Sequence, residues 1–226
     1  DLFEQLGPQD TVTFTGSAAT GQTLRQHPHL NRHSIAFTME ADSVNSAILV
    51  EDANDATIDL FVREVFREMT SKAGQKCTAI RRAFVPADLI DEVQQRLITK
   101  LAQVVVGDPQ RDNVTMGALA SLKQKHDVTE KVEQLARQAD VVFGSHLRND
   151  FVIEAAQPER GAFYPPTLLR CNEPDTADVV HQTEAFGPVC TLMPYQNLDQ
   201  LADLVARGEG SLVASIVRNT DSQIEA

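Results

Sequence analysis

The chain has 226 residues, of which 42% are hydrophobic and 23% are charged, values that are typical of globular proteins. Its 32 acidic and 20 basic side chains leave a net charge of −12 at pH 7, and such a surface repels phosphate backbones and anionic lipids. We therefore expect neither nucleic acid nor a membrane surface as a partner. No apolar run approaches the roughly 20 residues that cross a bilayer.

The first part of the chain predicts a strand, a glycine turn, a helix and a second strand. Residues 11–15 are β-branched and aromatic, Gly16 turns the chain, and Ser17 is a good N-cap for a helix over residues 17–26. Residues 35–39 then form a short apolar strand. A helix that begins after a glycine offers free N–H groups to an anion such as a cofactor phosphate. The alternative is an ordinary capped turn, because the stretch lacks the G-x-G-x-x-G fingerprint.

The rest of the chain alternates short apolar strands with amphipathic helices. The clearest helix covers residues 56–69, and we expect another to begin at Pro86 and run to Leu101. Further strands are expected at 47–50, 83–85, 104–106, 141–143, 189–193 and 212–217, and further helices at about 121–139 and 198–206. The alternation predicts an α/β fold with a mostly parallel sheet that is flanked by helices.

Two residues could carry the chemistry of a reaction. Cys77 follows a glycine-containing loop, where backbone N–H groups and Lys76 could favour a reactive thiolate. The alternative is a small buried hydrophobe, which is the interpretation we give to Cys171 and Cys190. Glu40 stands at the end of an apolar strand and could act as a general base, although most such carboxylates are merely solvated.

Other polar residues suggest binding sites. Glu184 and Phe186 precede a Gly-Pro turn and could hold a ribose hydroxyl and brace a flat ring; the alternative is a plain loop before a strand. His27, His29 and His33 have irregular spacing, and no Cys or Asp completes a ligand shell. We predict that these histidines lie at the surface and that the protein holds no metal.

Three widely spaced cysteines argue against a disulfide framework and predict a reducing compartment, the cytoplasm. The chain starts at Asp1 without Met and stops at Ala226 within what reads as the start of a helix. We therefore expect it to be a piece of a longer protein.

In chain order, these motifs resemble the aldehyde dehydrogenase superfamily. The series is Phe14-Thr15-Gly16-Ser17 with Gly21, then Glu40, Gly74-Gln75-Lys76-Cys77, Gly107-Asp108-Pro109, Pro166-Thr167-Leu168 and Glu184-Ala185-Phe186-Gly187-Pro188. The stretches around Glu40 and Cys77 also resemble the dehydrogenase part of the bifunctional ring-opening enzymes of phenylacetate catabolism, in which a hydratase domain acts on oxepin-CoA. Ala41-Asp42 stands where most members of the superfamily have Gly-Gly, and this departure points to the same branch.

The resemblance implies the C-terminal part of an NAD(P)-binding domain over residues 1–42 and a catalytic thiol domain, truncated at its C-terminus, over residues 43–226. It implies that Cys77 attacks the aldehyde carbon and that Glu40 activates the water that hydrolyses the resulting thioester. The cofactor-binding residues that it implies are Gly16, Ser17, Gly21, Glu184 and Phe186.

The same resemblance implies NADP as cofactor, with NAD as the alternative, and a CoA-linked semialdehyde as substrate. It also implies a homo-oligomer, and a hydratase domain in the full-length protein. Two alternatives stay open. One is a dehydrogenase for another aldehyde, including a CoA-acylating enzyme that does not need Glu40, and the other is a catalytically inert fragment or scaffold.

Overall fold

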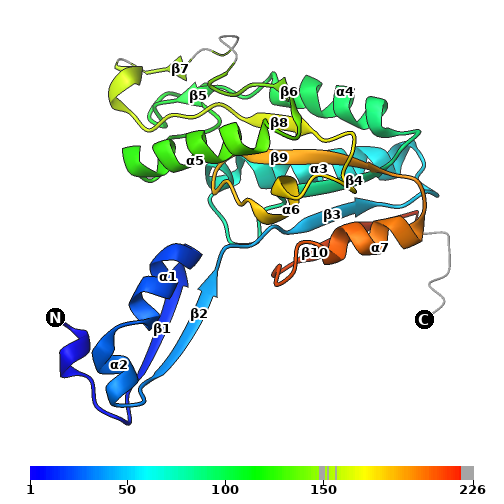
Figure 1. Cartoon of the computed structure of the whole chain (residues 1–226). Helices are drawn as coiled ribbons and strands as arrows, with labels where there is room; N and C mark the ends of the chain where they lie inside the picture. Colours follow the sequence, from blue (N-terminus) through cyan, green and yellow to red (C-terminus); the bar gives the residue numbers. More distant parts are fainter. Residues whose placement is uncertain (148–150, 152, 156, 220–226) are drawn as a thin grey trace. The chain divides into compact units, whose positions relative to one another are not determined.

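The computed structural model describes residues 1–147, 151, 153–155 and 157–219, and its chain divides into two compact units, Asp1–Ser43 and Val44–Ala226 (Figure 1). Each unit has its own sheet, and the two are described separately below. Within the described residues, no helix is both long enough and apolar enough to cross a membrane.

The first unit is a two-stranded parallel sheet with short helices. Ser17 caps its main helix, because the Ser17 Oγ accepts a hydrogen bond from the Thr20 N–H at 3.3 Å. The parallel register places Thr15 opposite Glu40, so both strands end at the same edge. The expected strands and helix are confirmed here. The elements are η1 (Phe3–Gln5), β1 (Thr11–Gly16), α1 (Ala18–Arg25), α2 (Pro28–Arg32) and β2 (Ala36–Ala41).

The histidine cluster lies in and beside the short helix α2, which was not predicted from the sequence. His27 caps this short helix, and its Nε2 also lies 2.9 Å from the carboxylate of Asp1. His29 Nε2 bonds the backbone oxygen of Leu6 at 2.8 Å. The three histidines are therefore half-buried structural groups rather than fully exposed ones. Among the described residues, no group of three or more His, Cys, Asp and Glu side chains is placed to hold a metal ion.

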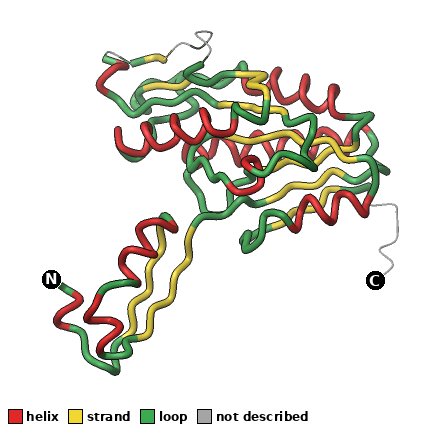
Figure 2. Tube along the Cα trace, in the orientation of Figure 1, coloured by secondary structure: helices red, strands yellow, loops and turns green. Residues whose placement is uncertain are grey.

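The second unit contains a six-stranded sheet in the order β10-β3-β4-β9-β8-β6 (Figure 2). Every neighbouring pair is parallel except β6 and β8, which are antiparallel, so the predicted mostly parallel sheet is confirmed. The strands are β3 (Ser46–Leu49), β4 (Arg82–Pro86), β6 (Asp140–Phe143), β8 (Thr167–Arg170), β9 (Val189–Tyr195) and β10 (Ala214–Val217). A separate pair, β5 (Val106–Gly107) and β7 (Ile153–Glu154), is also parallel.

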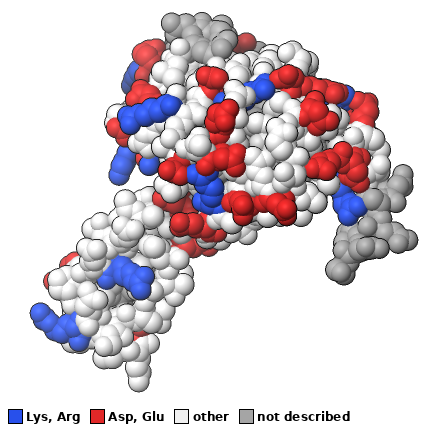
Figure 3. Space-filling model, turned by 45° about the vertical axis from the view of Figure 1, so that its right-hand side comes forward, with Lys and Arg blue, Asp and Glu red and all other residues white. Residues whose placement is uncertain are grey.

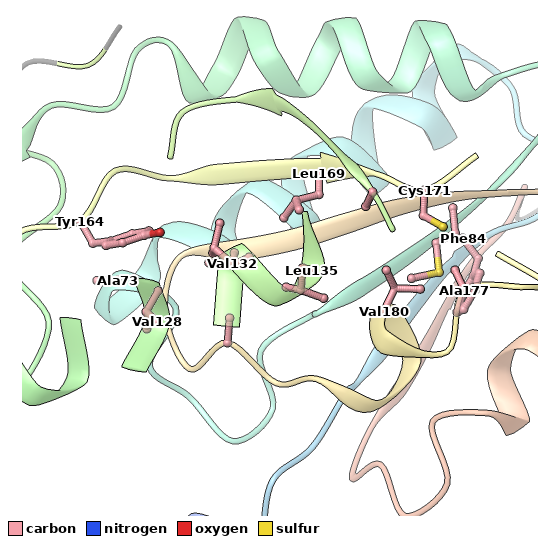
Figure 4. Close-up of a cluster of buried hydrophobic side chains, with 14 of the residues drawn as sticks. Ala73, Phe84, Val128, Val132, Leu135, Tyr164, Leu169, Cys171, Ala177 and Val180 are labelled. Atoms are coloured by element: carbon pink, nitrogen blue, oxygen red, sulfur yellow. The ribbon is translucent and has the colours of Figure 1, made fainter. Parts of the chain in front are cut away.

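Helices cover both faces of this sheet, as alternation along the strands requires. Ala47 and Leu49 pack into the core beneath α3 and α4, whereas Ile48 packs into the core beneath α5, α6 and α7, part of which Figure 4 shows. The helices are α3 (Asp55–Thr70), α4 (Ile90–Leu101), α5 (Leu122–Leu135), α6 (Val179–Gln182) and α7 (Leu198–Ala206), with the 3-10 turns η2 (Ser71–Gly74) and η3 (Pro158–Arg160).

The two cysteines that were interpreted as hydrophobes are confirmed as such. Cys171 and Cys190 are both fully buried. Burial raises the pKa of the Cys190 thiol to about 12, and it also raises the pKa of Cys171. Neither is therefore poised to form a thiolate near neutral pH.

The expectation that a helix begins at Pro86 is wrong. Pro86 is the last residue of β4, opposite Tyr195 in β9, and the helix begins only at Ile90. A proline can end a strand because it has no N–H to donate. The ladder passes instead to Ala87, whose N–H donates to the Tyr195 oxygen at 2.9 Å. The strand β8 and the four-residue helix α6 were not predicted either.

On the face of the second unit that Figure 3 displays, acidic side chains are spread widely over the surface. Among the acidic side chains of this unit, those of Asp55, Asp59 and Glu92 contact Arg96 of α4. This network is exposed, and such surface pairs contribute little to stability. The acidic surface agrees with the net charge of −12.

A buried arginine joins the sheet to the helices of one face. Arg82 is 1% exposed, and its guanidinium donates to the oxygens of Val44, Leu204 and Val205 and to Ser46 Oγ. It also donates to Nδ1 of His181 at 3.0 Å, while His181 Nε2 donates to the Pro174 oxygen at 2.9 Å. These partners require a neutral His181. Burial, aided by Arg82, lowers the pKa of His181 to about 4.

We expect acid to destabilise the protein through His181. Its pKa falls from 6.5 to about 4 on folding, so the unfolded chain binds the extra proton between these values. Stability from this group is complete above pH 6.5 and is lost as the pH falls towards 4, by about 3 kcal/mol at 1.36 kcal/mol per pKa unit. Urea unfolding at pH 7 and pH 4.5 measures the loss.

The matched variants are His181→Gln, which keeps an acceptor and a donor but does not titrate, and His126→Gln on the surface. His181→Gln should remove part of the pH dependence and His126→Gln none. An unchanged pH dependence in His181→Gln would contradict the assignment.

Candidate active site

Cys77 lies on a loop at the amino end of β4, between η2 and that strand. Its side chain is exposed and its thiol is free. We call residues 72–80 the Cys77 loop. The strands β3 and β9 flank β4 in the sheet, so the segments that lead into these two strands run beside this loop.

The start of the Cys77 loop has an unusual backbone. Lys72, Ala73 and Gly74 have φ of 53°, 51° and 69°, three successive residues in the left-handed region. Residues other than glycine each pay roughly 1–2 kcal/mol for this conformation. Gln75 helps to hold it, because its side chain accepts a hydrogen bond from Ala120 N at 2.8 Å and donates one to Lys72 O at 3.0 Å.

A buried asparagine, Asn45, holds the backbone of the Cys77 loop. The Asn45 Nδ2 donates to the backbone oxygens of Cys77 at 2.7 Å and Ala79 at 3.0 Å. The backbone oxygen of Asn45 accepts from the N–H groups of Arg81 and Arg82, both at 3.0 Å. The carbonyl of Cys77 is therefore fixed by a residue that the sequence reasoning did not single out. The available signal was one amide side chain two residues before the apolar run 47–50.

Arg81 is the second residue that the sequence reasoning missed. Its guanidinium donates to the backbone oxygens of Gly74 at 2.9 Å and Gly187 at 2.7 Å. Its Nε lies 3.3 Å from the carboxylate of Glu184, and its Cζ lies 5.4 Å from the centre of the Phe186 ring. Arg81 thus touches both the Cys77 loop and residues 183–188, which we call the Glu184 loop.

The Arg81–Glu184 ion pair is buried. The two side chains are 4% and 7% exposed. Burial lowers the pKa of Arg81, and the carboxylate of Glu184 opposes that shift. The expected ribose ligand Glu184 is therefore an ion-paired group in this structure, and Phe186 lies against the same cation.

The charge of Lys76 is paired with a carboxylate of α3. Its ammonium lies 2.7 Å from the carboxylate of Glu68, near the end of α3. This ion pair anchors the loop to the helix. The expectation that Lys76 favours the thiolate of Cys77 is therefore weakened, because Glu68 balances the lysine charge.

The remaining candidate residues lie in the first unit. Glu40 is exposed, near the end of β2, and Gly16 and Ser17 follow from the end of β1 at the same edge of the sheet. Gly21 is buried, and a Cβ there would come within 2.1 Å of the Met39 sulfur. The close packing of α1 on β2 is therefore sufficient reason for a glycine at this position.

Asp42 occupies the amino end of α1. Its carboxylate accepts a hydrogen bond from the Ala18 N–H at 3.1 Å. The expected phosphate site thus already donates to an anionic oxygen, which is what a helix N-terminus favours. This carboxylate belongs to the Ala41-Asp42 pair that departs from Gly-Gly.

We expect Gly74→Ala to disrupt the Cys77 loop. A Cβ on Gly74 would come within 2.1 Å of the Gly187 oxygen, and the backbone there has φ of +69°. The variant should lose about 2 kcal/mol or more of stability, measured by thermal unfolding, and the rate at which iodoacetamide alkylates Cys77 should change. Gly117→Ala is the control, because nothing lies within 4 Å of its Cβ. Equal behaviour of the two variants would contradict the close approach.

Comparison with known proteins bears on this arrangement. Residues 8–226 match the model of the aldehyde dehydrogenase family. The chain is 43% identical over 218 residues to 3,4-dehydroadipyl-CoA semialdehyde dehydrogenase of Aromatoleum evansii, which covers 96% of this chain and 42% of that protein. It is 44% identical over 103 residues to Protein MaoC of Klebsiella aerogenes, which covers 45% of this chain and 28% of that protein.

Solved structures agree. The crystal structure of a Mycobacterium tuberculosis aldehyde dehydrogenase complexed with NAD+ matches with a TM-score of 0.73 and 26% identity, covering 93% of this chain and 41% of that chain. The chain thus spans less than half the length of these relatives. Family model, relatives and fold agree, and the chain belongs to the aldehyde dehydrogenase family.

Proposed function

We propose that the protein containing this chain oxidises a CoA-linked semialdehyde to the carboxylic acid in aromatic catabolism, with NADP as cofactor and NAD as the alternative. The observation that carries the proposal is the exposed free thiol of Cys77 on a loop fixed by Asn45 and Arg81. The 43% identity to a CoA semialdehyde dehydrogenase supports the proposed substrate class.

Cys77 is the proposed nucleophile. Its thiolate adds to the aldehyde carbon, and the carbonyl oxygen becomes the alkoxide of a thiohemiacetal. Backbone N–H groups near Cys77 stabilise this oxyanion. A bound nicotinamide dinucleotide would accept the hydride that leaves the same carbon, so that the carbon becomes the thioester carbon on Cys77.

Glu40 is the proposed base for the second half of the reaction. Its carboxylate takes a proton from water, and the resulting hydroxide attacks the thioester carbon. The carbon–sulfur bond breaks, which releases the acid and restores the thiolate of Cys77. An exposed carboxylate at the end of a strand has the access to water that this step requires.

The cofactor contacts are proposed for two groups of residues. Gly16, Ser17 and Gly21, in the first unit as the C-terminal part of an NAD(P)-binding domain, would serve the pyrophosphate at the amino end of α1. The Ala18 N–H there already donates to the carboxylate of Asp42, so the site suits an anionic oxygen. Glu184 and Phe186 in the second unit, as the catalytic domain, would meet the nicotinamide ribose and ring.

The wider setting is also a proposal. A hydratase domain elsewhere in the same polypeptide would supply the semialdehyde from a CoA-linked ring. The relatives are much longer than this chain, since it covers 42% and 28% of two of them. We further propose a cytoplasmic location, in keeping with the free cysteines, and a homo-oligomer, which the family resemblance implies.

The product of the reaction tests the proposal. The whole protein, given a CoA-linked semialdehyde and NADP, should form the free acid, detected by mass spectrometry. Cys77→Ser should abolish turnover and leave cofactor binding intact, and Glu40→Gln should accumulate an acyl adduct on Cys77. Cys190→Ala is the control, because that thiol is buried in an apolar cluster and alanine adds no polar group there. A new acyl-CoA thioester as product would identify the CoA-acylating alternative, and full turnover in Cys77→Ser would remove the assigned nucleophile.

We expect Asp42→Asn to tighten cofactor binding. The asparagine keeps the hydrogen bond with Ala18 but removes a negative charge from the proposed phosphate site. The dissociation constant for NADP, measured by fluorescence titration, should fall roughly two- to fivefold, the usual scale of charge effects at a helix terminus. Asp10→Asn is the control, because that carboxylate bonds the Gly7 N–H instead. Weaker binding in Asp42→Asn would contradict the assigned phosphate site.

A further inference from the structure

Arg81 lies between the two loops that carry the proposed functional residues of the second unit. On one side it holds the backbone oxygen of Gly74 at 2.9 Å and approaches that of Lys76 at 3.5 Å, both within the Cys77 loop. On the other side it holds Gly187 at 2.7 Å and the carboxylate of Glu184 at 3.3 Å. One planar group thus serves partners on two loops that are more than 100 residues apart in sequence.

The two loops meet at this point without space between them. A Cβ on Gly74 would come within 2.1 Å of the Gly187 oxygen, so the two backbones are already in close contact. Their carbonyl oxygens face the same guanidinium. A displacement of either loop would leave buried donors of Arg81 unpaired, and this is costly where water is excluded.

We propose that Arg81 is a positioning residue that couples the Cys77 loop to the Glu184 loop, so that the proposed nucleophile and the proposed ribose ligand keep one arrangement. The inference rests on the proposed roles of Cys77 and Glu184. Arg81 does not touch the reacting atoms; it acts through the backbone of one loop and through the carboxylate and ring of the other.

The chemistry of arginine explains why lysine would not serve. The guanidinium presents five donors in a fixed plane and can also stack on an aromatic ring, whereas an ammonium is a compact point charge. A lysine at position 81 would keep the positive charge near Glu184 but could not span Gly74, Gly187 and Glu184 together. Arg81→Lys therefore removes the link between the loops with little change in charge.

Hydrogen–deuterium exchange of the whole protein, read by mass spectrometry, is the first test. In Arg81→Lys, amide exchange should quicken at least tenfold in both the Cys77 loop and the Glu184 loop. Arg96→Lys is the matched control, because Arg96 also binds several acceptors but on the surface, and both loops should exchange there as in the wild type. Faster exchange in only one loop, or in neither, would overturn the proposal.

Kinetics supply the second test, through the separation of KM from kcat. Arg81→Lys should raise the KM for the cofactor at least tenfold, through Glu184, and should also lower kcat, through Cys77. Adding Glu184→Gln to Arg81→Lys should raise the cofactor KM by less than twofold more, because the carboxylate is no longer held in its position against the ribose. A cofactor KM within twofold of the wild type, or fully additive effects of the two substitutions, would overturn the coupling.

A third variant keeps the proposal testable if Arg81→Lys does not fold. Glu184→Gln alone should quicken exchange in the Cys77 loop, although residue 184 lies in the other loop; unchanged exchange there overturns the coupling. A wild-type protein that oxidises no aldehyde would count against the proposed function and not against Arg81, because the exchange experiment needs no substrate.

Discussion

The second unit depends on a buried cation, the guanidinium of Arg81, which backbone carbonyl oxygens of that unit surround. Arg81 has few neighbours of opposite charge, and most of its donors end on carbonyl oxygens of two loops. Such an arrangement is stable only when each donor is satisfied, since the guanidinium has given up its water. The close approach of Gly74 to Gly187 and the burial of Glu184 both fit this requirement.

Beneath Arg81, further polar side chains are buried at the amino ends of the parallel strands. Asn45 leads into β3, and Arg82 is the first residue of β4. In open α/β sheets, ligand sites are usually found at the carboxyl ends of strands. Here the opposite edge of the second unit carries the loop of the proposed nucleophile, and the side chains of Asn45, Arg81 and Arg82 donate to backbone oxygens at that edge. These hydrogen bonds therefore fix the Cys77 loop to the sheet.

Much of this arrangement could be predicted from the sequence. The parts that depend on contacts between residues far apart in the chain could not. Helix periodicity located α3 and α7, and Ser17 marked the start of α1, because these signals are local. The motif order singled out Cys77 and Glu184, whose roles in the reaction stay predictions. Arg81 and Asn45 were missed because only the fold brings their hydrogen-bond partners next to them. Pro86 misled for a related reason, since its position in a ladder cannot be read from its neighbours.

The left-handed conformation of Lys72, Ala73 and Gly74 bears on whether the Cys77 loop could keep its geometry outside this fold. A short peptide with the sequence of the Cys77 loop would leave this conformation, because it would lose the hydrogen bonds that Ala120, Arg81 and Asn45 make with the loop. The thiol would then lose the backbone arrangement that surrounds it in the folded protein. The geometry around Cys77 is therefore a property of the assembled sheet, and it could not be transferred to another protein by grafting the loop residues alone.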